Sequence, residues 1–219
     1  FDNVANLAPS AIKMLKERYE GTRLGRQELY AEILEDIEGA LFHSANIEQN
    51  RIEVTPDMQR IVIAIDPSVT SKASSDETGI IVAGRGVDNH FYILEDKSGV
   101  FSPDVWIKRA IELYYKFDAD RIVCEVNNGG DLIEKLLRVQ DVNVPYSSVR
   151  ATRGKMLRAE PISALYEQGK VHHVGYFKEL EEQMCSYTPD TVKSPDRLDA
   201  LVWGITSLMN SGKAIFRIS

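Results

Sequence analysis

The chain has 219 residues, of which 43% are hydrophobic, with 26 Lys and Arg against 33 Asp and Glu and a formal net charge of -7. This length suits one catalytic-sized domain with a helical extension, and the sequence shows neither a secretory signal nor the run of about 18 apolar residues that a membrane helix needs. The acidic balance argues against a protein that coats nucleic acid, although it fits a metal centre built from carboxylates.

The first 55 residues are predicted to form a helical arm. A helix begins at Pro9 and Ser10, and a second helix is indicated by large aliphatic residues at four-residue spacing, namely Leu29, Ile33, Ile37 and Leu41. The arm has no strand pattern, and the sequence begins at Phe1 rather than Met. We therefore expect a fragment of a longer protein, in which residues 1–55 are the tail of an upstream domain and residues 56–219 form the main domain.

From Gln59 the pattern changes to strands. An apolar run over residues 61–65 leads directly into Asp66, which predicts a buried strand that ends in a carboxylate. After a polar loop, two more strand patterns cover residues 79–83 and 91–95. Three strands in succession predict an antiparallel meander.

Helices and strands alternate in the next part of the chain. A helix is predicted to begin after the capping residue Ser102, with Pro103 at its first position, and a strand over residues 121–126 follows. A second helix and a strand over residues 142–149 come next. Because strand, helix and strand in succession give parallel crossovers, we expect an α/β fold in which a mixed sheet carries helices on its faces.

Four carboxylates stand where this fold would bring them together. Asp66 and Glu125 lie at the carboxyl ends of two core strands, and Asp196 and Asp199 lie three residues apart on the first turn of a last helix that begins near Ser194. Ligands gather at the carboxyl ends of strands in open sheets. Close carboxylates resist joint ionisation unless a cation binds them, and oxygen ligands favour Mg²⁺ or Mn²⁺. Two such ions about 4 Å apart can hydrolyse a phosphodiester.

Each acid taken alone also has an ordinary explanation. An Asp before a proline, as at Asp66, is typical of a turn, and an Asp in a first helical turn stabilises the helix dipole. Glu125 is more informative, because an acid at the end of a buried strand is costly unless something binds it.

The remaining polar residues carry weaker signals. Residues 150–158 contain four basic side chains and no acid, namely Arg150, Arg153, Lys155 and Arg158. Such a segment is typical either of DNA phosphate contacts or of a solvated helix face. His172 and His173 are adjacent on a predicted strand and point to opposite faces, so they cannot serve one metal and are expected to pack or lie at the surface. The cysteines and tryptophans are expected to be core residues: Cys124, Cys185, Trp106 and Trp203.

Several of these segments together resemble a known family. The matching segments are residues 24–30, 64–68, 76–80, 124–127, 165–173 and 194–202. From about Asn6 to Met209, the chain resembles the carboxy-terminal part of tailed-phage large terminases. The nuclease domain of that family has the ribonuclease H-like fold shared with Holliday-junction resolvases, and the resemblance implies this fold here.

The resemblance also implies roles for the carboxylates. Asp66, Glu125 and Asp199 would be the metal-binding catalytic triad, and Asp196 an auxiliary acid near the second of two Mg²⁺ or Mn²⁺ ions. The implied activity is endonucleolytic cutting of concatemeric double-stranded DNA during genome packaging, in the host cytoplasm. Implied partners in the intact assembly are a portal protein and a small terminase subunit, and we expect the isolated domain to be a monomer.

A packaging ATPase would need a G-x-x-x-x-G-K-[ST] phosphate loop, which this sequence lacks. The nearest string, residues 153–155, has no first glycine and no hydroxyl residue. ATP hydrolysis is therefore not expected of this fragment, and the arm is interpreted as the tail of the motor.

Two other interpretations stay open. An actin-like phosphotransferase would also place an Asp between a strand and a meander, but it would need an Asp-x-Gly turn after a later strand, where this chain opens a helix. A non-catalytic module that docks on DNA or on a portal ring would need no metal. Metal binding separates these possibilities.

Overall fold

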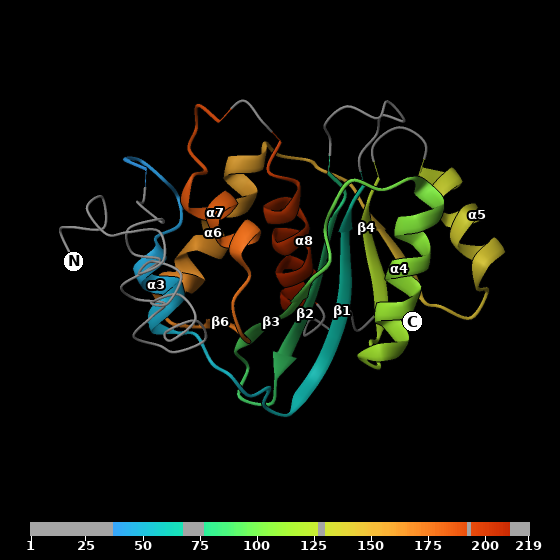
Figure 1. Cartoon of the computed structure of the whole chain (residues 1–219), viewed down its shortest axis with the longest axis horizontal. Coiled ribbons are helices and arrows are strands. Elements are labelled where there is room, and N and C mark those ends of the chain that lie inside the picture. The colour runs from blue at the N-terminus through green and yellow to red at the C-terminus, as the bar shows by residue number, and fades with distance from the viewer. Residues whose placement is uncertain (1–36, 68–76, 127–129, 192–193, 211–219) are drawn as a thin grey trace, which may run out of the picture.

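The computed structural model describes residues 37–67, 77–126, 130–191 and 194–210, which form one mixed sheet with helices on both faces (Figure 1). The strands are β1 (Met58–Asp66), β2 (Gly79–Gly86), β3 (Phe91–Asp96), β4 (Arg121–Glu125), β5 (Tyr146–Val149) and β6 (Val171–His173). The helices are α3 (Ser44–Gln49), α4 (Pro103–Lys116), α5 (Gly130–Gln140), α6 (Lys155–Glu167), α7 (Lys178–Cys185) and α8 (Asp196–Asn210).

The sheet has the strand order β5-β4-β1-β2-β3-β6. The predicted meander is confirmed, because β1 pairs antiparallel with β2 and β2 pairs antiparallel with β3. The predicted parallel part is confirmed as well, since β4 pairs parallel with both β1 and β5. Asp66 and Glu125 therefore end neighbouring parallel strands at the same edge of the sheet.

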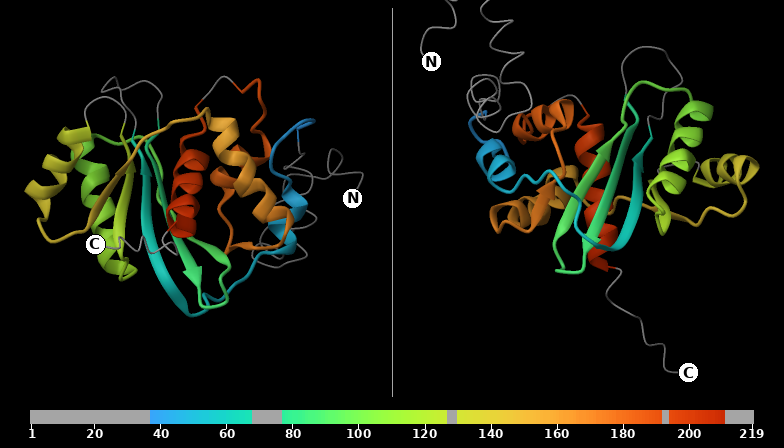
Figure 2. Two further views of the ribbon diagram at one scale, coloured as in Figure 1. Left: turned by 180° about the vertical axis from the view of Figure 1, so that it is seen from behind. Right: turned by 60° about the horizontal axis from the view of Figure 1, so that its bottom comes forward.

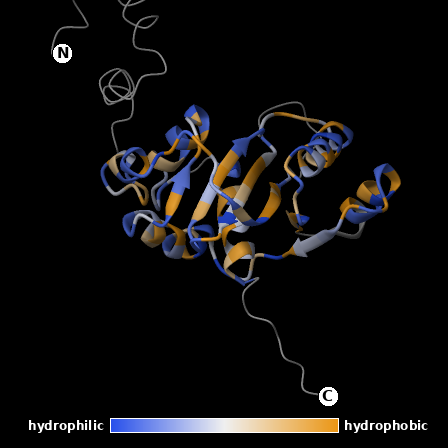
Figure 3. Ribbon diagram, turned by 90° about the horizontal axis from the view of Figure 1, so that it is seen from below, coloured by the Kyte–Doolittle hydropathy of each residue, from blue (hydrophilic) through white to orange (hydrophobic). Residues whose placement is uncertain are grey.

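Alternate side chains of the strands enter two apolar cores, as a period of two requires. On one face Val62, Ile81 and Val123 pack with α6, α7 and α8. On the other face Ile63, Ile80 and Ile122 pack with α4 and α5. Figure 2 shows these two helical layers on opposite sides of the sheet, and Figure 3 shows stretches of apolar residues along the central strands between them.

The end of the arm differs from the sequence prediction. Leu29 and Ile33 lie outside the described residues, but the predicted helix through Ile37 and Leu41 is wrong. Residues 37–43 form turns, and the following helix, α3, is only six residues long. The reason is local, since Gly39 has a φ of +81°, a left-handed conformation that ends helices.

The described part of the arm packs on the main fold. Phe42 and Ile47 are buried in the core that contains α6 and α7. The backbone N–H of Leu41 donates to the carbonyl of Tyr187, and Ser163 on α6 donates to the carbonyl of Leu41. Residues 40–52 therefore belong to the packed structure.

Two other elements depart from the sequence pattern. The fifth strand begins at Tyr146 rather than at residue 142, because Arg138 donates to the carbonyls of Val142 and Val144 and holds the preceding residues in a turn. The sequence pattern does not indicate α6, whose interior contains Pro161. Ser102 occupies the N-cap position of α4, as predicted, but its side chain makes no capping hydrogen bond.

Several simpler predictions are confirmed. Cys124 and Cys185 are buried free thiols, and burial, with the nearby charge of Asp66, raises the pKa of the Cys124 thiol. Trp106, on α4, is buried in the core. Across the described ranges, no helix has both the length and the apolar character needed to cross a membrane.

Candidate active site

The four predicted carboxylates converge at one end of the sheet. Asp66 ends β1, Glu125 ends β4, and Asp196 and Asp199 lie on the first turn of α8. Glu125, Asp196 and Asp199 are buried, with 6%, 8% and 3% of their surface exposed, and Asp66 is partly buried. Three buried acids in one region call for positive charge nearby.

A glycine allows α8 to approach the strand ends. Gly79 lies directly opposite Asp66 in the β1–β2 pair, and a Cβ at this position would overlap the backbone oxygen of Asp196. On α7, the Gln183 side chain accepts a hydrogen bond from the backbone N–H of Leu198 at 2.9 Å and so satisfies a donor in the first turn of α8. Sequence reasoning missed both residues, although a glycine that starts a buried strand is a usable signal.

Gly79→Ala should therefore push the first turn of α8 away from Asp66. We expect a loss of about 1–3 kcal/mol in the free energy of unfolding, as for other overpacked sites, together with a weaker affinity for Mn²⁺. Urea unfolding and calorimetric titration with Mn²⁺ measure the two effects. Gly154→Ala is the control, because a Cβ there meets nothing within 4 Å. A Gly79→Ala protein with wild-type stability and Mn²⁺ affinity would contradict this account of the close approach.

The carboxylates act on one another electrostatically. Burial, followed by the charges of Asp199 and Glu125, raises the pKa of Asp66 to about 8; Asp196 adds to this effect and Lys155 opposes it. The contributions of the other three acids arise because their charges lie near Asp66. The predicted convergence of four acids is present in the structure.

The raised pKa of Asp66 makes stability depend on pH. Between the ordinary value of 3.8 and about 8, the native protein holds a proton that the unfolded chain releases. The free energy of unfolding therefore falls as the pH rises through this range. Asp66→Asn removes the titrating group. At pH 8 without divalent metal, we expect this variant to have a free energy of unfolding higher than that of the wild type by ~1.4 kcal/mol or more, which is the equivalent of one pKa unit.

Urea unfolding in EDTA between pH 5 and pH 8 measures this difference. The control is Asp57→Asn, an exposed acid just before β1, which should follow the wild-type curve. Equal pH slopes for Asp66→Asn and the wild type would show that Asp66 does not titrate in this range.

Two basic side chains from α6 point into the carboxylate cluster. The Lys155 ammonium donates to Asp199 and, at 2.7 Å, to the hydroxyl of Ser194. Burial alone would lower the pKa of Lys155, but the hydrogen bond to Asp199 and the surrounding acids leave it raised. Arg158 Nη2 lies 3.1 Å from Asp199 Oδ1 and 3.7 Å from Glu125 Oε2. Asp199 and Glu125 are thus paired with positive charges from within the chain.

Trp203 completes this cluster. It is buried, as predicted, but its indole Nε1 donates to Glu125 Oε2 at 2.5 Å, and the Arg158 guanidinium lies 4.8 Å from its ring centre. Trp203 lies four residues after Asp199, on the same helix face. That spacing could have identified it as a site residue. The other two basic residues of the segment, Arg150 and Arg153, are exposed.

The donor set fits a hard divalent ion by its chemistry. Carboxylate oxygens are the ligands that Mg²⁺ and Mn²⁺ prefer. The β1–β4 pairing and the contact of α8 with Gly79 bring the acids together. As the side chains lie, no three acidic, histidine or cysteine side chains of the described ranges are grouped tightly enough to hold one ion. Lys155 and Arg158 form ion pairs with carboxylate oxygens of Asp199 and Glu125. To bind a metal ion, those oxygens would have to turn away from the basic side chains and toward the ion.

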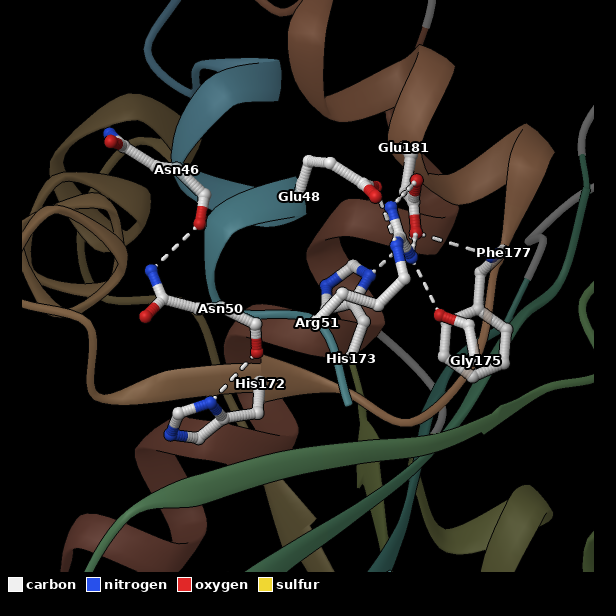
Figure 4. Close-up of polar contacts among 9 residues, drawn as sticks. All are labelled: Asn46, Glu48, Asn50, Arg51, His172, His173, Gly175, Phe177 and Glu181. Carbon is white, nitrogen blue, oxygen red and sulfur yellow. Dashed lines mark hydrogen bonds and ion pairs between the residues drawn. The ribbon is translucent and has the colours of Figure 1, made fainter. Parts of the chain in front are cut away.

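The two histidines lie on β6, three strands away from β1, and face opposite sides as predicted (Figure 4). His173 is fully buried, with Nδ1 2.8 Å from Glu181 Oε1 and Nε2 2.7 Å from the hydroxyl of Tyr166. His172 Nδ1 donates to the carbonyl of Asn50 at 2.8 Å, and burial lowers its pKa. Both histidines have structural partners, in agreement with the packing role expected of them.

The sequence also matches known proteins. Residues 63–208, well over half of the chain, match the family described as the terminase RNaseH-like domain. The chain belongs to this family. Its mixed sheet and flanking helices are those of a ribonuclease H-like fold, as the resemblance implied. No curated protein gives a significant sequence match.

Solved structures of large terminases have a fold similar to that of this chain, although their sequence identity to it is low. The large terminase nuclease of the thermophilic phage G20c is 15% identical, with a TM-score of 0.55 over 77% of this chain and 98% of that one. The same nuclease with bound magnesium is 14% identical, with a TM-score of 0.57 over 78% and 98%. The large terminase of a second thermophilic bacteriophage is 13% identical, with a TM-score of 0.60 over 95% of this chain and 55% of that one.

Proposed function

We propose that this chain is the metal-dependent endonuclease part of a phage large terminase and that it cuts concatemeric double-stranded DNA during genome packaging. The observation that carries the proposal is the convergence of Asp66, Glu125, Asp196 and Asp199 at one end of the sheet, where burial and the neighbouring acids raise the pKa of Asp66. Membership of the terminase RNaseH-like family supports it. The G20c nuclease was solved with magnesium, zinc and cobalt bound, which supports the use of a divalent metal.

Asp66, Glu125 and Asp199 would hold two ions, Mg²⁺ or Mn²⁺, with Asp196 as an auxiliary acid. When bound, such ions supply an activated water and stabilise the leaving oxygen of the phosphodiester. The Trp203 indole fixes the orientation of the Glu125 carboxylate through its hydrogen bond. Lys155 and Arg158 place two positive charges beside the acids, where they would attract the DNA phosphate.

The basic segment would bind the DNA backbone. Arg150 and Arg153 are exposed on the connection between β5 and α6, beside Lys155 and Arg158. Arginine and lysine contacts to phosphate fix the position of DNA without reading its bases, and they weaken as salt rises. We therefore assign DNA contact to these four residues.

The wider assignments follow from the same proposal. Residues 1–55 would be the arm that joins an upstream packaging ATPase to the nuclease domain at 56–219. A portal protein and a small terminase subunit would be partners of the intact assembly in the host cytoplasm, and the isolated domain would be a monomer.

Digestion of supercoiled plasmid by the purified chain tests the proposal. With Mg²⁺ or Mn²⁺ we expect nicked and then linear DNA, and with EDTA no product. If folded protein cleaves nothing with either metal, the nuclease proposal is wrong, and a module that docks on DNA or a portal without cutting is the better interpretation.

A further inference from the structure

A pocket of about 310 Å³ opens between α6 and the last turns of α8. Its wall includes three arginines and three large apolar side chains, namely Arg150, Arg153, Arg158, Leu157, Trp203 and Met209. None of the described residues that line it is acidic. Arg158 pairs with Asp199 and Glu125. The exposed guanidinium groups of Arg150 and Arg153 are therefore the ones that would bind an anion here.

The pocket adjoins the carboxylate cluster because two side chains belong to both. Arg158 lines the pocket and also reaches Asp199 and Glu125. Its side chain is only 10% exposed, and its buried Nε has no hydrogen-bond partner within the described structure. Trp203 lines the pocket and donates to Glu125. A ligand in this pocket would therefore lie next to the carboxylate cluster.

The pocket wall has a basic part and an apolar part, so a ligand that fits it has an anionic group and an apolar group. Guanidinium groups bind phosphate through paired hydrogen bonds. Leu157 and Met209 are 55% and 42% exposed, unusual for large apolar residues at the rim of a charged pocket. They offer an apolar surface to a flat group beside the phosphate. A nucleotide has both parts, because it joins a phosphate to a flat base whose ring faces stack on apolar side chains.

The size of the pocket limits which nucleotide it can take. A volume of about 310 Å³ is at the low end for small-ligand pockets, which range over about 300–1,000 Å³. It can hold one nucleotide but not a base pair within a duplex. Enzymes that need access to a single nucleotide bind it displaced from its stack.

We propose that this pocket binds one unstacked nucleotide of the DNA strand next to the cut phosphodiester, with its phosphate on Arg150 and Arg153 and its base against Leu157 and Met209. That the ligand is DNA rests on the proposed nuclease function, but binding itself needs no metal. The pocket should therefore prefer single-stranded or frayed DNA to an intact duplex.

The test measures binding of the full chain to fluorescein-labelled oligonucleotides by anisotropy, in EDTA so that nothing is cut. The probes are a single-stranded thymidine pentanucleotide and a blunt duplex of 12 base pairs. We expect the wild type to bind both probes, the duplex through backbone phosphates alone and the pentanucleotide through the pocket as well. Arg153→Ala should weaken pentanucleotide binding about tenfold, the value of one charged hydrogen bond, and Met209→Ala should weaken it by a smaller factor.

The matched control is Lys135→Ala, which removes a positive charge from α5 on the opposite face of the sheet and should leave both affinities unchanged. Arg153 is exposed, so its variant should fold, and circular dichroism checks this. Wild-type pentanucleotide affinity in Arg153→Ala, or a Met209→Ala protein that binds the pentanucleotide as tightly as the wild type does, would overturn the proposal.

The binding and cleavage assays can fail independently. Plasmid cleavage by the wild type together with wild-type pentanucleotide affinity in Arg153→Ala would reject the pocket and keep the nuclease. Arginine-dependent pentanucleotide binding without metal-dependent cleavage would keep the pocket and reject the nuclease.

Discussion

Asp66→Asn, Glu125→Gln and Asp199→Asn should each lower metal-dependent cleavage of plasmid DNA by more than about 100-fold, the upper end of the loss for residues that only orient metal ligands. Each change keeps the size of the side chain but removes the negative charge that a hard cation requires. Asp196→Asn should cause a smaller loss, because Asp196 is assigned an auxiliary role.

Plasmid digestion with Mn²⁺ over a range of enzyme concentrations measures these losses, and circular dichroism confirms that each variant is folded. Asp57→Asn is the matched control, because it removes an exposed carboxylate just before the other end of β1 and should cleave like the wild type. Cleavage by Asp66→Asn at the wild-type rate would remove Asp66 from the mechanism.

Glu181→Ala should destabilise the fold by about 3–5 kcal/mol, the cost of removing one partner from a buried ion pair. Glu181 is 1% exposed, and its two oxygens accept hydrogen bonds from Arg51 at 2.7 and 2.8 Å. The same carboxylate lies 2.8 Å from His173 Nδ1 and accepts the backbone N–H of Phe177 at 3.2 Å (Figure 4). Without Glu181, the Arg51 guanidinium loses its buried carboxylate partner and keeps the pairing to Glu48, the carbonyl of Gly175 and the ring of Tyr176.

Urea unfolding at pH 7 measures this loss. Glu182→Ala is the control one residue away, because Glu182 is 40% exposed and lies 3.9 Å from an exposed Lys178; it should change stability by less than about 1 kcal/mol. A loss of less than about 1 kcal/mol in Glu181→Ala would show that the network does not hold the arm on the fold.

The same network gives the stability of the protein an acid dependence. Burial would raise the pKa of Glu181, but hydrogen bonds from His173 and Arg51 outweigh burial and lower it below the ordinary value of 4.5. A lowered pKa contributes stability above the unfolded value, and that stability is lost as pH falls through the folded value. The difference between wild type and Glu181→Ala should therefore shrink below pH 4.5.

The sequence was sufficient to predict the carboxylates because local patterns place them. Asp66 and Glu125 follow apolar strands, and the spacing of Asp196 and Asp199 puts both on one turn of a helix. The meander and the parallel crossovers follow from element order, which is also a local property of the chain. The family resemblance then gave these acids a common role.

Other parts of the site depend on contacts between distant segments. Lys155 and Arg158 turn toward the acids because α6 packs beside α8, and nothing in residues 150–158 fixes that packing. The partners Arg51 and Glu181 are 130 residues apart, so neither predicts the other. Gly79 and Trp203 have no special local pattern. Gly79 admits the first turn of α8, and Trp203 donates to Glu125, only because α8 packs against the sheet.

We propose that Asp66, Glu125 and Asp199 form the metal centre of this chain. The most direct measurement is an anomalous difference map from crystals soaked in Mn²⁺, recorded near the manganese absorption edge. We expect peaks within coordination distance of carboxylate oxygens of all three residues. Peaks at other side chains, with no ion bound to Asp66, would contradict the proposal.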